Sequence, residues 1–222
     1  MLERNNYVDE ERVMLNKNYQ IPEKIVLEEQ LNLIDKFKQE IETEKKNKPE
    51  LWNIIQQKLK MSWTYNSNAI EGSTLSEGDT IFFLQYGLTV AGKPLKDFLY
   101  AKNHSEAIDI LNDVVTNNRE ISEGLIKEFN ALLLDGIKNT KAINQFGQSI
   151  QKTANPGEYK KNPNHVLQLD GTIHHYIEPI QVQIEMEMLI NWINQNKYKI
   201  HPVIVGAIAH YNMVRIHPFD EF

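Results

Sequence analysis

Apolar side chains recur every three or four residues through the first third of the chain, with charged or amide side chains between them. This spacing places the apolar residues on one face of a helix. It predicts an amphipathic helix over residues 22–47 and a second from Pro49 to near Gly72, because proline is tolerated in a first helical turn. Glu71 then lies at the C-terminal end of the second helix. The apolar positions are Ile25, Leu27, Leu31, Leu33, Ile34, Phe37 and Ile41, followed by Leu51, Ile54, Ile55, Leu59, Met61 and Trp63.

Helical signals continue after residue 72. Residues 74–77, Thr-Leu-Ser-Glu, have the spacing of a capping box, and Gly87 has the position of a glycine that ends a helix. We therefore predict a helix between these two signals. Further helices are predicted over residues 95–115, 122–137, 184–195 and 202–216. The chain is expected to be mainly α.

The segment from Asn144 to Glu178 has a different composition, rich in Gly, Pro, Asn and Gln with short apolar pieces. One such piece, Val166–Leu169, is followed by Asp170-Gly171, a dipeptide typical of a hairpin turn. We predict a small β-hairpin at this place.

Composition narrows the class of protein. The 222 residues are 41% hydrophobic, which suffices for a buried core, and the net charge of -6 argues against a general nucleic-acid binder. The absence of cysteine removes disulfides and thiolate chemistry. The N-terminal residues lack the pattern of a signal peptide, and no stretch approaches about 18 apolar residues. These features predict a cytoplasmic protein with no nucleic-acid or membrane partner.

The segment from His217 to Glu221 follows a predicted helix that ends at Ile216. It resembles the signature of the Fic (Fido) family, His-Pro-Phe-x-(Asp/Glu)-Gly-Asn-Gly-Arg. Phe222 stands where the first glycine of that signature belongs, and the rest of the signature does not follow.

Other segments resemble the same family in the same order. Residues 67–72, Ser-Asn-Ala-Ile-Glu-Gly, are similar to its inhibitory motif (Ser/Thr)-x-x-x-Glu-(Gly/Asn). Residues 156–160 are similar to its Pro-Gly-x-(Tyr/Phe)-Arg segment, with Lys160 in place of Arg, and residues 171–179 resemble its flap. The resemblance implies a Fic-type helical core with a β-hairpin flap and an N-terminal helical layer. The expected domains are residues 1–75 and a C-terminally incomplete core over residues 76–222.

The resemblance also implies a reaction. A Fic enzyme of this kind moves AMP from ATP to a hydroxyl side chain, Ser, Thr or Tyr, of a target protein. His217 would be the general base, a role that suits an imidazole with a pKa near 6.5. Glu221 would bind the Mg²⁺ that accompanies ATP, and Pro218 and Phe219 would anchor the loop. The plain alternatives are a helix-end histidine that only packs and a solvated terminal carboxylate.

The family also implies a brake and a docking edge. Glu71, within the motif that includes Ser67 and Gly72, would point into the nucleotide site and block productive binding of ATP. The alternative for Glu71 is a surface carboxylate before a glycine. The flap would offer its edge to an extended target segment. Its predicted residues are Thr172, Ile173, His174, His175 and Tyr176.

The incomplete signature leads to one expectation, and two alternative functions remain open. The Gly-Asn-Gly-Arg part supplies backbone N–H groups and an Arg to the phosphates in the family, so the chain as printed is expected to be inactive. It could act only as a helical fragment that binds a partner or forms a homodimer. The complete enzyme could also remove AMP, with Glu71 orienting a water molecule.

Overall fold

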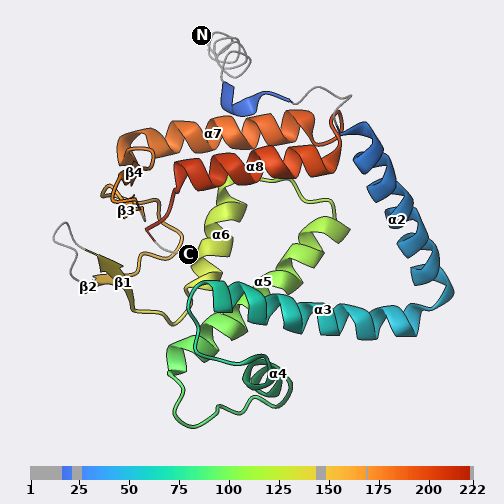
Figure 1. Ribbon diagram of the computed structural model, residues 1–222, viewed down its shortest axis with the longest axis horizontal. Coiled ribbons are helices and arrows are strands. Elements are labelled where there is room, and N and C mark those ends of the chain that lie inside the picture. Colours follow the sequence, from blue (N-terminus) through green and yellow to red (C-terminus); the bar gives the residue numbers. More distant parts are fainter. Residues whose placement is uncertain (1–16, 22–26, 144–148, 169, 221–222) are drawn as a thin grey trace. The chain divides into compact units, whose positions relative to one another are not determined.

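The computed structural model describes residues 17–21, 27–143, 149–168 and 170–220. It confirms a mainly α chain with small antiparallel hairpins (Figure 1). The chain divides into two compact units. The first comprises residues 1–40, 121–124 and 159–220, and the second comprises residues 41–120 and 125–158. The predicted domains, residues 1–75 and 76–222, stay a prediction.

The first unit is built on two long helices that pack against each other, α7 (Pro179–Asn196) and α8 (Pro202–Ile216). The short helix η1 (Lys17–Tyr19) packs on α8, and the Tyr19 ring lies 5.7 Å from the Trp192 ring of α7. Arg215 of α8 forms an ion pair of 2.5 Å with Glu185 of α7. The fully buried side chains of this core include Val182, Met186, Leu189 and Ile216.

The predicted hairpin belongs to the first unit. Strand β3 (His165–Leu167) pairs antiparallel with β4 (Ile173–His175), so that His165 faces His175 and Leu167 faces Ile173. Gly171 in the connecting turn has a φ of 83°, in the left-handed region that glycine adopts without a steric penalty. The prediction of a hairpin turn at Asp170-Gly171 is confirmed.

The second unit is built on helices α3 (Pro49–Ile70), α4 (Glu77–Tyr86) and α5 (Leu95–Thr116), which contact one another. Leu75, Phe98 and Ala101 form a buried apolar cluster, and the Phe83 ring packs against the Phe98 ring at 5.1 Å. A hairpin of β1 (Asn139–Ile143) and β2 (Ser149–Thr153) also belongs to this unit. The helical signals did not predict this hairpin.

Two helices contribute residues to both units. Helix α2 (Glu28–Asn47) ends as predicted, and the start predicted at residue 22 lies outside the described residues. Helix α6 (Glu123–Leu133) begins one residue later and ends four residues earlier than the predicted helix over 122–137. Its last turn is followed by Gly136, which has a φ of 74°, and the chain then enters β1.

The predicted capping box is two residues out of register. Ser76 caps α4 by accepting a hydrogen bond from the Asp79 N–H, and Asp79 accepts one from the Ser76 N–H. The N–H and hydroxyl of Thr74 both donate to the Asp97 carboxylate of α5, at 2.8 and 2.7 Å. Thr74 therefore links the segment before α4 to helix α5 and does not cap the start of α4. Gly87 ends α4 in the left-handed conformation, as predicted.

Candidate functional site

Helix α8 places His217 at its C-terminal end. Pro202 occupies the first turn and the His201 side chain accepts a hydrogen bond from the Val203 N–H, which caps the helix start. The helix ends because His217 adopts a left-handed conformation with a φ of 46°. A residue with a side chain pays about 1–2 kcal/mol for this conformation. The fold maintains it only because the surrounding contacts hold the loop.

The loop after α8 is anchored by the segment around Tyr159. Pro218 and Phe219 are buried, and the Phe219 ring lies 5.4 Å from the Tyr159 ring. The Lys160 N–H donates to the Pro218 carbonyl at 2.8 Å. The two residues expected to anchor the loop therefore lie in the core of the first unit.

Lys160 reaches the end of α8 with its side chain. It is 3% exposed, and its Nζ donates to the Ile216 carbonyl at 3.2 Å and to the Asn164 Oδ1 at 2.6 Å. A cation is favourable at this end of a helix because the last carbonyls carry partial negative charge. Burial lowers the pKa of Lys160 to about 8, against the smaller opposing effects of Glu178 and Asp220. The group is still mainly protonated at pH 7.

Asn164 connects Lys160 to the histidine. Its amide nitrogen lies 2.8 Å from Nδ1 of His217 and donates to the Phe219 carbonyl at 3.1 Å. Nδ1 of His217 also lies 3.2 Å from the Phe219 carbonyl. Sequence reasoning missed Asn164, and it noted Lys160 only as a substitute for the family's Arg. That substitution in a motif was the one available signal.

The surroundings of His217 favour its neutral form. Burial is the main cause that lowers its pKa below the ordinary 6.5, and the positive charge of Lys160 adds to this effect. The Phe219 carbonyl and the Asp220 carboxylate act in the opposite direction. The imidazole of this half-buried residue is therefore uncharged at pH 7, as a general base requires.

The flap brings one aromatic ring onto His217. The Tyr176 ring lies 4.3 Å from the imidazole with an interplanar angle of 34°. His174 packs edge-on against Tyr176 at 4.8 Å, and His175 packs against His165 across the hairpin at 4.4 Å. Thr172 stays in the turn, where its N–H and hydroxyl donate to Asp170. Strand β4, including Ile173, is exposed along its length.

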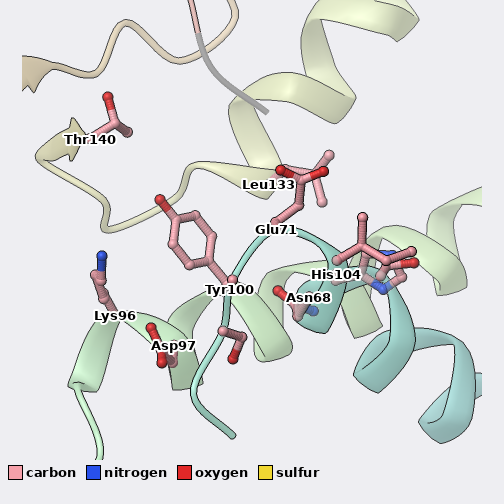
Figure 2. Close-up of a pocket in the computed structure, with 12 residues that line it drawn as sticks. Asn68, Glu71, Lys96, Asp97, Tyr100, His104, Leu133 and Thr140 are labelled. Carbon is pink, nitrogen blue, oxygen red and sulfur yellow. The ribbon is translucent and has the colours of Figure 1, made fainter. Parts of the chain in front are cut away.

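Glu71 belongs to the second unit, where it caps the C-terminal end of α3 as predicted. It is exposed, and Gly72 after it has a φ of 84°. Glu71 lines a cavity of about 550 Å³ between α3, α5 and the start of β1 (Figure 2). The residues that line this cavity are Ser67, Asn68, Ile70, Glu71, Gly72, Ser73, Lys96, Asp97, Tyr100, His104, Leu133 and Thr140.

The cavity combines both charges with aromatic surface. Lys96 supplies a cation, and Glu71 and Asp97 supply carboxylates. His104 is half-buried, contacts Thr64 through Nδ1 at 3.2 Å, and has a pKa lowered by burial. The volume of the cavity lies in the range of sites that bind small molecules.

The predicted metal ligand Glu221 lies outside the described residues. Among the residues that the structure describes, no group of three or more His, Asp or Glu side chains is arranged to hold a metal ion. Asp220 is the described carboxylate whose charge acts on His217. Protein Mg²⁺ sites that bind together with a nucleotide commonly use one or two carboxylates and phosphate oxygens, and of such carboxylates the described residues supply Asp220 near His217. No described helix has the length and apolar character needed to cross a membrane.

Comparisons with known proteins agree with this arrangement. Residues 120–221 match the Fic/DOC family. A protein adenylyltransferase, fic-1, of Caenorhabditis elegans is 25% identical over 163 residues, which cover 72% of this chain and 28% of the relative. A protein adenylyltransferase, Fic, of Drosophila virilis is 27% identical over 158 residues, covering 71% of this chain and 29% of the relative.

A solved structure supports the same assignment. A Fic domain containing signaling protein from Bacteroides thetaiotaomicron superposes with a TM-score of 0.68 and 30% identity, covering 78% of this chain and 61% of that one. The helical fold with its hairpin beside a helix-end histidine is thus that of a Fic-type domain. Together these findings support the chain as a Fic-family protein, with residues 120–221 matching the family. It spans about 28% of the length of the curated relatives.

Proposed function

We propose that the Fic domain of this chain transfers AMP from ATP to a hydroxyl side chain of a protein target. The observation that carries the proposal is the position of His217, a neutral imidazole held at the end of α8 and stacked on the flap. The relatives named protein adenylyltransferase support the choice of reaction.

The reaction requires a base and a leaving group. The target hydroxyl oxygen attacks the α-phosphorus of ATP, the bond from that phosphorus to the bridging oxygen breaks, and pyrophosphate leaves. The hydroxyl proton passes to His217. Nε2 is the nitrogen for this role, because Nδ1 faces Asn164 and the Phe219 carbonyl within the loop. General base catalysis of this kind contributes typically about 10²–10⁴-fold.

The flap is the proposed docking edge for the target. Strand β4 is exposed from Ile173 to His175, and it pairs with β3 on one side. An extended peptide can add to such an edge by main-chain hydrogen bonds, which demand little of the target sequence. Tyr176 follows this strand directly and contacts His217, so a peptide paired with β4 is carried toward the base.

Glu71 is the proposed brake. It lies beside a cavity that also contains Lys96, and its carboxylate repels polyphosphate. We propose that it lowers productive binding of ATP. The exposed C-terminal end of α3 supports a movable brake, because few contacts are lost when the carboxylate turns away.

Magnesium and the phosphate cradle complete the proposal. Glu221 is the proposed ligand of Mg²⁺, which when bound to ATP neutralises phosphate charge. The printed residues do not include the Gly-Asn-Gly-Arg of the family signature. We expect the 222-residue chain alone to show little or no transfer.

The test uses ATP labelled on its α-phosphate, with the 222-residue chain and a version extended through Gly-Asn-Gly-Arg and a following helix. Label is expected on protein with the extended version and more strongly after Glu71→Gly. His217→Ala in the extended Glu71→Gly version should remove it. Absence of label from every version, including extended Glu71→Gly, would contradict the proposed reaction. Release of AMP from a labelled target that is lost in Glu71→Gly would indicate that Glu71 serves removal of AMP.

A further inference from the structure

The hydrogen bonds around Nδ1 of His217 contain a conflict with its role as a base. A neutral imidazole carries one proton, and the two ring nitrogens have opposite roles. Nδ1 lies within hydrogen-bond distance of both the Asn164 amide nitrogen and the Phe219 carbonyl. The first contact requires a lone pair on Nδ1, and the second requires a proton. One tautomer satisfies only one of them.

The orientation of the Asn164 amide follows from its other neighbours. The Lys160 ammonium has donors only and lies 2.6 Å from one end of the amide, which must therefore be the oxygen. The Phe219 carbonyl has acceptors only and lies 3.1 Å from the other end, which must therefore be the nitrogen. Rotating the amide by 180° would place donor against donor and acceptor against acceptor. An N–H of Asn164 thus faces Nδ1 of His217.

We propose that Asn164, oriented by Lys160, holds His217 in the tautomer with its proton on Nε2. The contact of 2.8 Å is shorter than the 3.2 Å contact to the carbonyl, which agrees with Nδ1 as the acceptor in this structure. In this state Nε2 has no lone pair for a substrate proton. Asn164 and Lys160 are positioning residues, because they act on the reaction only through His217.

The second contact supplies the active alternative. When Asn164 turns away, Nδ1–H can donate to the Phe219 carbonyl and the lone pair moves to Nε2. The two states differ by one side-chain rotation and by exchange of the ring proton through solvent, which takes a proton from Nε2 and supplies one to Nδ1. This consequence for catalysis rests on the proposed function, in which Nε2 is the base. The tautomer assignment itself does not rest on the proposed function, because it concerns the protein without nucleotide.

The test is the tautomer of His217, read by long-range proton–nitrogen correlation NMR at pH 7 in the 222-residue chain with labelled histidine. The signal is assigned by its loss in His217→Gln. We expect a protonated Nε2 and an unprotonated Nδ1 in the unmodified protein. Asn164→Asp, which presents only acceptors to Nδ1, should reverse the assignment. Asn164→Ala should change the ratio of the two tautomers by about fivefold or more, as for one net hydrogen bond.

Two further variants sharpen the result. Lys160→Met should change the ratio in the same direction but less, because the Phe219 carbonyl still attracts the amide nitrogen. Asn196→Ala is the matched control, since Asn196 is a half-buried amide of the same unit that donates to the Trp192 carbonyl. It should leave the tautomer unchanged. A protonated Nδ1 in the unmodified protein, or no change in folded Asn164→Asp, would overturn the proposal whether or not AMP transfer is ever observed.

Activity provides the link to function. In the extended protein, Asn164→Ala should raise the rate of label transfer at saturating ATP and leave the KM for ATP unchanged, because it frees the lone pair on Nε2 without touching the nucleotide. A lower rate together with the expected NMR change would show that Asn164 also supports the active geometry and would overturn its role as a restraint.

Discussion

His217 and Glu71 each follow the last residue of a helix, and their surroundings differ sharply. Around His217, Ile216 and Pro218 are buried and Lys160 reaches in to bind the last carbonyl of the helix. Glu71 is exposed, and Ile70 before it is 83% exposed. The proposed base is therefore held in one place, whereas the proposed brake can move at little energetic cost. A reaction needs fixed geometry at the base, and a regulatory group needs two accessible positions.

The largest expected effect is on catalysis at the rigid end. His217→Ala in the extended, Glu71→Gly protein should lower label transfer by about 10²–10⁴-fold, because the proton of the target hydroxyl has no acceptor. His210→Ala is the matched control, since His210 is an exposed histidine of the same helix. Equal rates for both variants would show that the helix-end position of His217 has no catalytic meaning.

The second effect concerns stability. Phe219→Ala should lower the free energy of unfolding by about 3–5 kcal/mol, because a 2% exposed ring is removed from the core of the first unit. Ile70→Ala at the other helix end should change it by less than about 0.5 kcal/mol. Urea unfolding followed by circular dichroism measures both. Similar losses for the two variants would remove the contrast between the two ends.

The third effect tests the brake. If the Glu71 carboxylate and one phosphate charge of bound ATP are about 8 Å apart, they repel each other by roughly 2 kcal/mol at an effective dielectric constant of about 20. Glu71→Gln in the extended protein should therefore strengthen productive ATP binding by about 30-fold, seen as a higher kcat/KM for label transfer. Glu77→Gln, an exposed carboxylate of the same unit, should have no such effect. A transfer rate insensitive to both substitutions would leave Glu71 as a surface residue.

The elements that the sequence predicted well are those set by local pattern. Helix α8 has the predicted bounds of residues 202–216, and the Asp170-Gly171 turn forms the predicted hairpin. Both depend on neighbours within a few residues, namely proline in a first turn and glycine with positive φ. The resemblance to the Fic family added the fold, because its motifs fix the order of these elements.

The parts that the sequence did not predict depend on contacts between distant segments. Thr74 has the local features of a helix cap, but Asp97, 23 residues further along, takes its hydrogen bonds. The link from Lys160 through Asn164 to His217 joins residues more than 50 positions apart. No periodicity in one sequence reports such pairs. A lysine in the place of a motif arginine indicates only that a cation is needed there.

The smallest expected effect concerns the charge next to the base. Lys160→Met removes a cation that contributes to the lowered pKa of His217, so this pKa should rise toward the ordinary 6.5. Proton NMR titration of the His217 ring measures the change. Lys197→Met, in which the lost cation lies over the Tyr198 ring instead, should leave the pKa of His217 unchanged.

The pKa of His217 in the unmodified folded protein is lower than in the unfolded chain, so the unfolded chain binds protons more readily. The free energy of unfolding should therefore fall as pH decreases below about 6.5. In the extended Lys160→Met protein, the loss of label transfer on acidification should begin at higher pH, because His217 then becomes protonated at higher pH. If the pH at which transfer is lost stays the same while the pKa of His217 measured by NMR changes, a group other than His217 limits the reaction at low pH.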